Sequence, residues 1–222
     1  MSTPSVVVFD VNETLSDLTP MGQRFADVGV PEWTAKVWFA SLLRDGFALT
    51  AAGTTERFST IGEGVLRSVL AGQTLTRNLD AAIAHIMSGF LELAVHPDVP
   101  DGVRALAASG ARLVTLTNGS TEVAERLFAA GGIRDHFERL LSVEDAGAWK
   151  PAAAAYEYAA HTCSVDPADM LLVAVHPWDI DGAKRAGLRT AWINRQARPY
   201  PAHFLAADHS VAALSELAGV VG

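Results

Sequence analysis

Several features that would assign this chain of 222 residues to a specialised class of protein are scarce in it or missing. Its one cysteine, Cys163, excludes an internal disulfide and a cysteine-rich zinc site, and it suits a reducing compartment. The longest apolar runs, such as residues 170–175, are far shorter than the roughly 20 residues that cross a bilayer. No basic segment precedes the first apolar run, so we expect no signal peptide and a cytoplasmic protein.

Positive charge is outnumbered: 17 Lys and Arg residues stand against 25 Asp and Glu residues, which gives a formal net charge of −8 at pH 7. Because nucleic acids and anionic membrane surfaces attract basic patches, we expect neither to be a partner. Hydrophobic residues make up 50% of the chain and charged residues 19%, a balance typical of folded domains. A chain of this size can bury about 70% of its surface, enough for a large core.

Short runs of β-branched and other apolar residues predict the strands of a parallel sheet. Val6–Phe9 is apolar throughout, as expected of a strand that is covered on both faces. Four later runs end at polar residues and complete the set: Arg112–Leu116, Arg139–Val143, Met170–Val175 and Arg189–Ile193. Helical patterns lie between the runs from residue 98 onward, and this alternation is typical of a doubly wound α/β core with a parallel sheet.

Residues 16–97 interrupt this alternation, because they contain helical patterns and no clear strand. We therefore predict an α/β core domain made of residues 1–15 and 98–222, with residues 16–97 inserted as a helical cap domain over the strand ends. The helices expected in the cap are Glu32–Leu49, Thr55–Leu70 and Leu79–Ala94. The helices expected in the core include one behind Ser120 or Thr121 as N-cap, one at Ala152–His161 and a short one at Ala183–Ala186.

Polar side chains follow several of the predicted strands at the point where each strand ends. Asp10 comes directly after the first strand, Thr117 and Asn118 follow the second, and Asp179 follows the fourth after a short loop. Lys150 precedes a proline at the start of a helix. Taken alone, each of these residues is common in turns, at helix caps or on protein surfaces that have no catalytic role. Because the carboxyl ends of parallel strands meet at one edge of a sheet, their joint placement predicts an active site there.

Four motifs carry these residues along the chain: FDVNETL, LVTLTNGS, WKPAAAAYEYA and VAVHPWDIDGAKRAG. Their order and spacing resemble those of the haloacid dehalogenase superfamily, whose first loop reads D-x-x-x-T and whose later loops supply a Ser or Thr, a Lys before Pro and an acidic group. The resemblance covers the whole chain, with residues 16–97 in the place of that superfamily's cap. It implies that Asp10 is a nucleophile.

Two positions distinguish the branches of this superfamily. Its phosphatases resemble D-x-D-G-T, in which the second Asp is a general acid, and an acidic pair in their fourth loop helps to hold Mg²⁺. Here Asn12 stands in place of that acid and Val175 in place of one acidic residue. The segments around Tyr156 and Trp178 are instead similar to the type II 2-haloacid dehalogenase branch. This resemblance implies a hydrolase that acts on carbon–halide bonds with no metal or other cofactor, because halide is a weak base and leaves without an acid.

The resemblance to this branch also implies a role for each matching residue. Asp10 would attack the carbon that bears the halogen, Asp179 would position or deprotonate a water, and Lys150 would orient both carboxylates. The covalent aspartyl ester would then be hydrolysed. The partner would be a small 2-halo carboxylic acid. The residues expected to bind it are Val11, Thr14, Thr117, Asn118 and Tyr156, together with Phe39 and His176, which stand where the branch has other residue types.

Three pocket positions depart from the branch. Phe39 stands where the branch has an Arg that helps to hold halide, and Ala174 and His176 stand where it has Ser and Asn. Arg44, farther along the same cap helix, is one candidate for the missing cation. The alternative interpretation is that Arg44 is a solvated residue on the outside of the helix. His176 follows a buried strand at the edge of the site, where it could donate to halide or to a carboxylate.

Two other interpretations stay open at this stage. One is a phosphatase or another hydrolase of the same superfamily with altered metal ligation. The other is a non-catalytic binding protein that keeps the fold, although the retained Asp10, Lys150 and Asp179 favour an enzyme. The chain length, halogen and stereochemistry of the substrate are left open, and so is the oligomeric state, with a homodimer among the alternatives.

Overall fold

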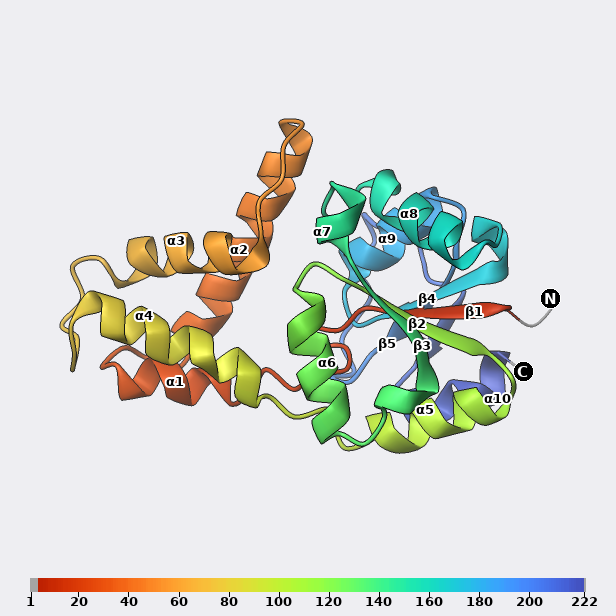
Figure 1. Cartoon of the computed structure of the whole chain (residues 1–222), viewed down its shortest axis with the longest axis horizontal. Coiled ribbons are helices and arrows are strands. Elements are labelled where there is room, and N and C mark those ends of the chain that lie inside the picture. The colour runs from red at the N-terminus through yellow and green to blue at the C-terminus, as the bar shows by residue number, and fades with distance from the viewer. Residues whose placement is uncertain (1–3, 222) are drawn as a thin grey trace.

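A parallel sheet forms the centre of the protein in the computed structural model, which describes residues 4–221. Within that part of the chain, six strands lie in the order β3-β2-β1-β4-β5-β6, and all neighbours pair in parallel (Figure 1). The strands are β1 (Val6–Phe9), β2 (Arg112–Thr117), β3 (Phe137–Ser142), β4 (Met170–Ala174), β5 (Arg189–Ile193) and β6 (His209–Val211). The predicted doubly wound α/β class is therefore confirmed.

The winding of the sheet reverses between β1 and β4. β1 lies between β2 and β4, with Phe9 opposite Thr115 on one side and opposite Val173 on the other. From β1 the chain winds outward through β2 and β3 in one direction, and through the remaining strands in the other. The crevice at such a reversal, outside the carboxyl ends of the strands, is the usual ligand site of doubly wound sheets. Asp10 follows β1 at this point, and Val175 follows β4.

Helices cover both faces of the sheet, which explains why its central strands are apolar throughout. Figure 1 shows one layer with α5 (Val99–Ala108), α6 (Thr121–Ala130) and α10 (Ala218–Val221), and a second layer with α7 (Val143–Ala146), α8 (Ala153–Cys163) and α9 (Pro177–Arg185). Three 3-10 turns complete the core: η2 (Arg134–His136), η3 (Pro167–Asp169) and η4 (Leu214–Glu216).

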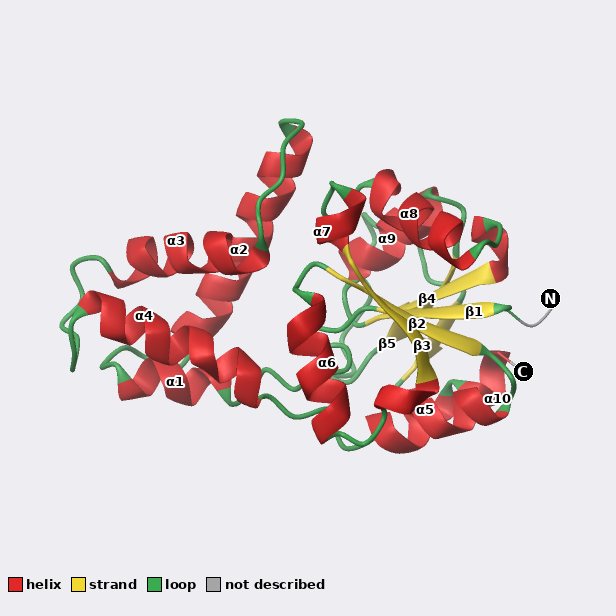
Figure 2. Cartoon of the chain, viewed as in Figure 1, coloured by secondary structure: helices red, strands yellow, loops and turns green. Residues whose placement is uncertain are grey.

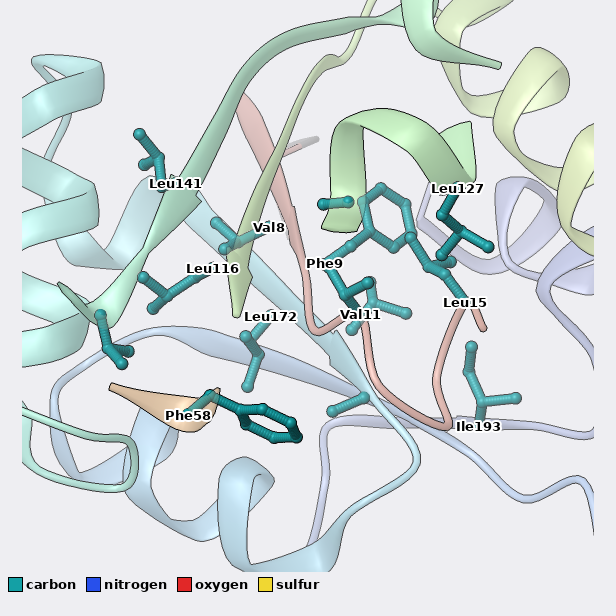
Figure 3. Packing of buried hydrophobic residues seen from close by; sticks show 14 of the residues in the cluster. Val8, Phe9, Val11, Leu15, Phe58, Leu116, Leu127, Leu141, Leu172 and Ile193 are labelled. Carbon is teal, nitrogen blue, oxygen red and sulfur yellow. The ribbon is translucent and has the colours of Figure 1, made fainter. Parts of the chain in front are cut away.

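The core packs side chains from neighbouring strands against one another and against the helices. In Figure 3, Val8, Leu116 and Leu172 come from three adjacent strands, and Leu127 of α6 lies near Phe9. All five are at least 96% buried, with 4% exposure or less. Because burying such a side chain contributes about 1.5–3 kcal/mol, this cluster holds the strand ends rigidly in place.

The helical segments after β1 lie together beside the carboxyl ends of the strands (Figure 2). They are α1 (Met21–Asp27), α2 (Thr34–Ala51), α3 (Phe58–Leu70), α4 (Leu79–Ser88) and the 3-10 turn η1 (Gly89–Glu92). Trp38 is at their centre: its ring lies 5.9 Å from Phe25 and 5.5 Å from Phe90, and its Nε1–H donates to the Gly62 carbonyl at 2.9 Å. A helical cap therefore follows the first strand, and its boundaries at residues 16 and 97 stay a prediction.

Most predicted elements are confirmed, and the differences have local causes. α9 begins at Pro177 rather than Ala183, because a proline is favoured in the first turn of a helix. α4 ends at Ser88 rather than Ala94, since the chain continues there as η1. The sequence does not predict β6, which has three residues and no apolar run of its own. Among residues 4–221, no helix combines the length and apolar character that crossing a membrane requires.

Candidate active site

The carboxyl ends of β1 and β4 bring two aspartates to one point. Asp10 follows β1, and its backbone N–H donates to the Val173 carbonyl at 3.1 Å, so β4 fixes where its side chain begins. Asp179 lies in the first turn of α9, the helix that follows β4. Lys150 lies in the loop between α7 and α8, just before a cis peptide bond to Pro151.

Lys150 joins the two aspartates. Its Nζ donates to Asp10 Oδ1 at 2.9 Å and to Asp179 Oδ2 at 2.5 Å. The side chains of Lys150 and Asp179 are fully buried, and that of Asp10 is 5% exposed. A buried ammonium is costly unless it is paired, and here two carboxylates accept from it. The predicted placement of these three residues together is observed.

The three buried charges shift one another's proton affinity in different directions. Burial opposes ionisation of Asp10, but Lys150 and then His176 outweigh it and hold the pKa of this carboxyl well below its usual range. Burial also opposes the charge on Lys150, yet its two carboxylate neighbours raise the pKa of the ammonium. For Asp179, burial and the nearby charge of Asp10 raise the pKa despite Lys150. Asp10 is therefore a carboxylate at neutral pH, and Asp179 is the better base.

Two hydroxyl groups hold the aspartates in position. The Thr14 hydroxyl donates to Asp10 Oδ2 at 2.6 Å and accepts the backbone N–H of Val175 at 3.1 Å. The Tyr156 hydroxyl donates to Asp179 Oδ1 at 2.6 Å. Burial, followed by the charge of Asp179, raises the pKa of Tyr156 well above its ordinary value, so this hydroxyl stays a donor. Both hydroxyls therefore hold the aspartate carboxylates in place, and the predicted binding of substrate by Thr14 and Tyr156 stays a prediction.

The loop after β2 supports Lys150 through its backbone. Asn118 Oδ1 accepts the backbone N–H of Lys150 at 3.0 Å, and Asn118 Nδ2 donates to the Lys150 carbonyl at 3.4 Å. Thr117 Oγ1 accepts the backbone N–H of Gly119 at 3.0 Å. A Cβ on Gly119 would lie 3.3 Å from Asn12 Nδ2, so the loops after β1 and β2 are close neighbours. Thr117 and Asn118 thus lie at the predicted edge, and binding of substrate by them stays a prediction.

His176 makes two contacts, to Asp10 and Glu13. Its Nδ1 lies 3.1 Å from Asp10 Oδ2, and its Nε2 lies 2.8 Å from Glu13 Oε2. Burial lowers the affinity of this ring for a proton, but hydrogen bonds to the two carboxylates more than offset it and raise the pKa of His176 from 6.5 to about 10. The sequence singles out His176 but not Glu13. The one signal for Glu13 was its place inside the D-x-x-x-T loop.

A cavity of about 770 Å³ lies beside this histidine, between the cap and the core. Phe39 of α2 lines it from the cap, and His176, Trp192 and Arg195 line it from the core. Phe39 is 7% exposed, so the position that holds an Arg in the resembled branch presents an aromatic ring here. Val11 directly follows Asp10, and its side chain is buried in the core, so its part in binding substrate stays a prediction.

Arg44 does not replace the missing cation of the cap. Its side chain is 70% exposed and pairs with Asp45 at 2.8 Å. It lines a different groove, between α2 and α3. The interpretation of Arg44 as a solvated helix residue is therefore correct, because its position on α2 turns it away from the sheet.

A family model described as a haloacid dehalogenase-like hydrolase matches residues 4–187. The chain belongs to this family. Among curated relatives, (S)-2-haloacid dehalogenase 1 of Pseudomonas sp. (strain CBS-3) is 28% identical over 95% of this chain and 93% of its own length. Haloacetate dehalogenase H-2 of Moraxella sp. (strain B) is 40% identical over 48% of this chain and 47% of its own length. A solved L-2-haloacid dehalogenase, 27% identical, superposes with a TM-score of 0.92 over 99% of both chains.

These similarities confirm the branch that the four motifs resemble, the type II or L-2-haloacid dehalogenases. They leave the assignment of individual site residues to the geometry described above. Within the described range 4–221, no group of three or more His, Cys, Asp or Glu side chains is arranged to hold a metal ion.

Proposed function

We propose that this protein hydrolyses a small 2-halo carboxylic acid through a covalent ester on Asp10. The observation that carries the proposal is Lys150, buried between two carboxylates whose pKa values are shifted in opposite directions. Asp10 is held ionised, as a nucleophile must be, while Asp179 has a raised pKa, as suits a base that takes a proton from water. Lys150 orients both.

In the first step, an oxygen of Asp10 attacks the carbon that bears the halogen. The new C–O bond forms as the C–halogen bond breaks, and the halide leaves with the bonding pair and with inversion at that carbon. The backbone N–H groups near Val11 and Asn118, with the Thr117 hydroxyl, are the donors that we assign to the substrate carboxylate. The N–H of Gly119 already donates to Thr117 Oγ1 at 3.0 Å and so orients that hydroxyl.

In the second step, water attacks Cγ of Asp10 and transfers a proton to Asp179. The 2-hydroxy acid then leaves with one of the original oxygens of Asp10. Tyr156, which donates to Asp179 at 2.6 Å, keeps this aspartate turned towards Lys150. No step requires a metal ion, which accords with Asn12 and Val175 at positions where the phosphatases of the superfamily carry acidic residues.

A halide-release screen over short 2-halo acids, fluoride included, tests the proposal. Because several relatives carry the name (S)-2-haloacid dehalogenase, (S)-2-chloropropionate and haloacetates come first. Single turnover in ¹⁸O-labelled water should place the label in Asp10 before it reaches product. Label in the first product instead would mean that water attacks the carbon directly.

The same screen, repeated with EDTA, separates the proposal from its main alternative. Halide release should be unchanged by EDTA and by added Mg²⁺. Hydrolysis of a generic phosphate ester that is lost with EDTA and restored by Mg²⁺ would instead identify a phosphatase. A protein that binds halo acids in a titration without converting them would be a binding protein.

A further inference from the structure

The two oxygens of the Asp10 carboxylate have different surroundings. Oδ1 accepts one hydrogen bond, from Lys150 Nζ at 2.9 Å. Oδ2 accepts two, from the Thr14 hydroxyl at 2.6 Å and from His176 Nδ1 at 3.1 Å. Among the described residues, Asp10 therefore presents one oxygen that faces a single donor, Lys150, and one that is enclosed by two side chains.

Both donors on Oδ2 are fixed by further contacts. The Thr14 hydroxyl accepts the backbone N–H of Val175, which leaves its proton for Asp10. The ring of His176 is held at its far nitrogen by Glu13 at 2.8 Å, and Trp178 stacks on it at 5.0 Å. Fixed donors of this kind need no reorganisation when charge develops on the oxygen that they face.

Glu13 is itself held in an unusual conformation. Its φ of 63° lies in the left-handed region, which residues other than glycine seldom adopt. His96 Nε2 lies 3.0 Å from the Glu13 carbonyl, and the Glu13 N–H donates to Ser16 Oγ at 3.3 Å. Surrounding bonds therefore maintain a strained turn whose effect is to aim the carboxylate at His176.

The contacts make His176 a cation. Each ring nitrogen faces a carboxylate oxygen, and each bond needs an N–H on the ring, so the imidazolium satisfies both. The charged groups around it are Asp10 and Glu13 in direct contact, Lys150 on the other oxygen of Asp10, and Arg195 across the cavity. The attraction of the imidazolium to the two carboxylates outweighs its repulsion from Lys150 and Arg195, in agreement with the raised pKa of His176.

The position of this cation decides which step it serves. In the displacement, halide leaves on the side of the carbon opposite the attacking oxygen, so a donor bonded to the nucleophile itself is on the wrong side to hold halide. Alkylation of Oδ2 would turn an anionic acceptor of two bonds into a weakly accepting ester oxygen. Alkylation of Oδ1 leaves Oδ2 as the carbonyl oxygen and preserves both bonds.

We propose that His176, oriented by Glu13, forms with Thr14 an oxyanion hole on Oδ2 of Asp10, which acts in hydrolysis of the aspartyl ester and not in release of halide. Within the proposed function, on which this inference rests, it makes His176 a catalytic residue and Glu13 a positioning residue.

Hydrolysis of the ester, the second step, consists of addition of water and departure of the alkoxide. Water adds to Cγ, its proton goes to Asp179, and the electron pair of the C=O bond moves to Oδ2 between Thr14 and His176. The C=O bond re-forms, the bond from Cγ to Oδ1 breaks, and Lys150 donates a proton to the departing alkoxide. Asp179 returns a proton to Lys150 across 2.5 Å, and the new carboxylic acid of Asp10 releases its proton to solvent.

The experiment compares the two half-reactions in the full-length His176→Gln variant by rapid quench. The substrate is a 2-halo acid that the unaltered protein converts, and the exposed His161→Gln variant is the control. We expect one equivalent of halide per site at close to the unaltered rate, followed by 2-hydroxy acid formation slowed about 10²–10³-fold, the usual effect of removing one oxyanion-hole donor. The ester should accumulate on Asp10 and be visible in the mass of the intact protein. His161→Gln should behave as the unaltered protein.

Glu13→Gln gives an independent readout, because it keeps the histidine and removes one of its carboxylates. A raised pKa of about 10 means that His176 is charged below that pH and loses its charge above it. In the aspartyl ester, Asp10 no longer carries the charge that helps to raise this pKa, so ester hydrolysis in the unaltered protein should fall at a pH below about 10. In Glu13→Gln the fall should come at a lower pH still, because the second carboxylate is also missing.

Three results would overturn the inference. One is a slowed halide burst with no ester accumulating in His176→Gln, which would place the histidine in the displacement. A second is a Glu13→Gln variant with an unshifted alkaline limb, which decides the matter even if His176→Gln does not fold. A third is absence of halide release from every 2-halo acid by the unaltered protein, and only this result also removes the proposed function.

Discussion

The two sides of the site are built from different kinds of residue. The sheet edge supplies buried charges in hydrogen-bond contact, Asp10, Lys150 and Asp179, each anchored within a few residues of a strand or a helix start. The cap contributes aromatic rings, with Phe39 on the cavity and Phe47 against Trp178 at 5.0 Å. The buried charges thus lie beside rigid strand ends, whereas the cap adds aromatic walls to the cavity.

The two sides meet at Trp149, the residue before Lys150. Its backbone N–H donates to Thr50 Oγ1 at 3.1 Å, and its Nε1–H donates to the Glu56 carbonyl at 3.0 Å. Its ring stacks on Phe58 with centroids 6.2 Å apart. Thr50, Glu56 and Phe58 belong to α2, the loop after it and α3, so the cap is docked directly beside Lys150.

Replacing Asp10, the proposed nucleophile, should have the largest effect. Asp10→Asn should abolish halide release, because an amide oxygen is a far poorer nucleophile than a carboxylate. The matched control is Asp181→Asn, which removes a carboxylate that pairs with Arg185 at 2.8 Å on α9. Halide release would be measured after intact mass has excluded deamidation of the variant. Activity in a verified Asp10→Asn protein would mean that the reactive group lies elsewhere on the sheet edge.

Removing the bridging cation should come next. Lys150→Met should lower the rate about 10²–10³-fold, the usual loss for one preorganised charge at a site. Two carboxylates would then repel each other, so the pKa of Asp10, now held low, should rise. The acid limb of the pH–rate profile should move to higher pH, since Asp10 must be ionised to react.

Lys184→Met is the matched control for Lys150→Met, because Lys184 pairs with Asp208 at 2.6 Å but is 31% exposed. It should leave both the rate and the acid limb unchanged. A near-normal rate in Lys150→Met, with folding verified by thermal denaturation, would contradict the central role of this lysine.

Disturbing the docking of the cap should have a smaller effect, mainly on stability. In Gly46→Ala, the added Cβ would lie 2.4 Å from Trp149 Cε3, so the ring or α2 must shift. Overpacking of this kind typically costs about 1–3 kcal/mol. Because Trp149 precedes Lys150, kcat should fall as well. Denaturant unfolding and steady-state kinetics would measure the two effects.

Gly64→Ala in α3 is its control, because a Cβ there meets nothing within 4 Å. Alanine at this exposed position of α3 should stabilise the protein by up to about 1 kcal/mol and leave activity unchanged. Equal effects of the two substitutions would show that the contact between Trp149 and α2 does not matter.

Adding a cation to the cap should have the smallest effect on rate. Phe39→Arg should raise halide release from chloro substrates a few-fold, if the halide leaves towards the ring of Phe39. Val37→Arg, at a position 44% exposed on the same helix, should change nothing. The ratio kcat/KM for 2-chloropropionate would be compared between them. A lower value in Phe39→Arg alone would show that the aromatic wall excludes charge from the site.

Some features of the site could not be predicted from the residues. The place of Glu13 inside the D-x-x-x-T loop puts it near the site but does not show what its side chain contacts, and its contact with His176 spans 163 positions of the chain. Arg44 lies on the same helix as Phe39, and only the orientation of α2 shows that it points away from the cavity. The contact between Glu13 and His176 and the direction of Arg44 both depend on how the cap and the loops are placed, which short-range sequence patterns do not encode.

The sequence by itself determined the parallel sheet, the helical cap after the first strand, and the grouping of Asp10, Lys150 and Asp179 at one edge. It could do so because buried strands are recognisable as apolar runs and their carboxyl ends must meet. Only the tertiary structure decided that His176 faces the nucleophile, that Glu13 holds it, and that the cap rests on Trp149. These contacts join segments far apart in the chain, and a side chain's proton affinity depends on what folding places around it.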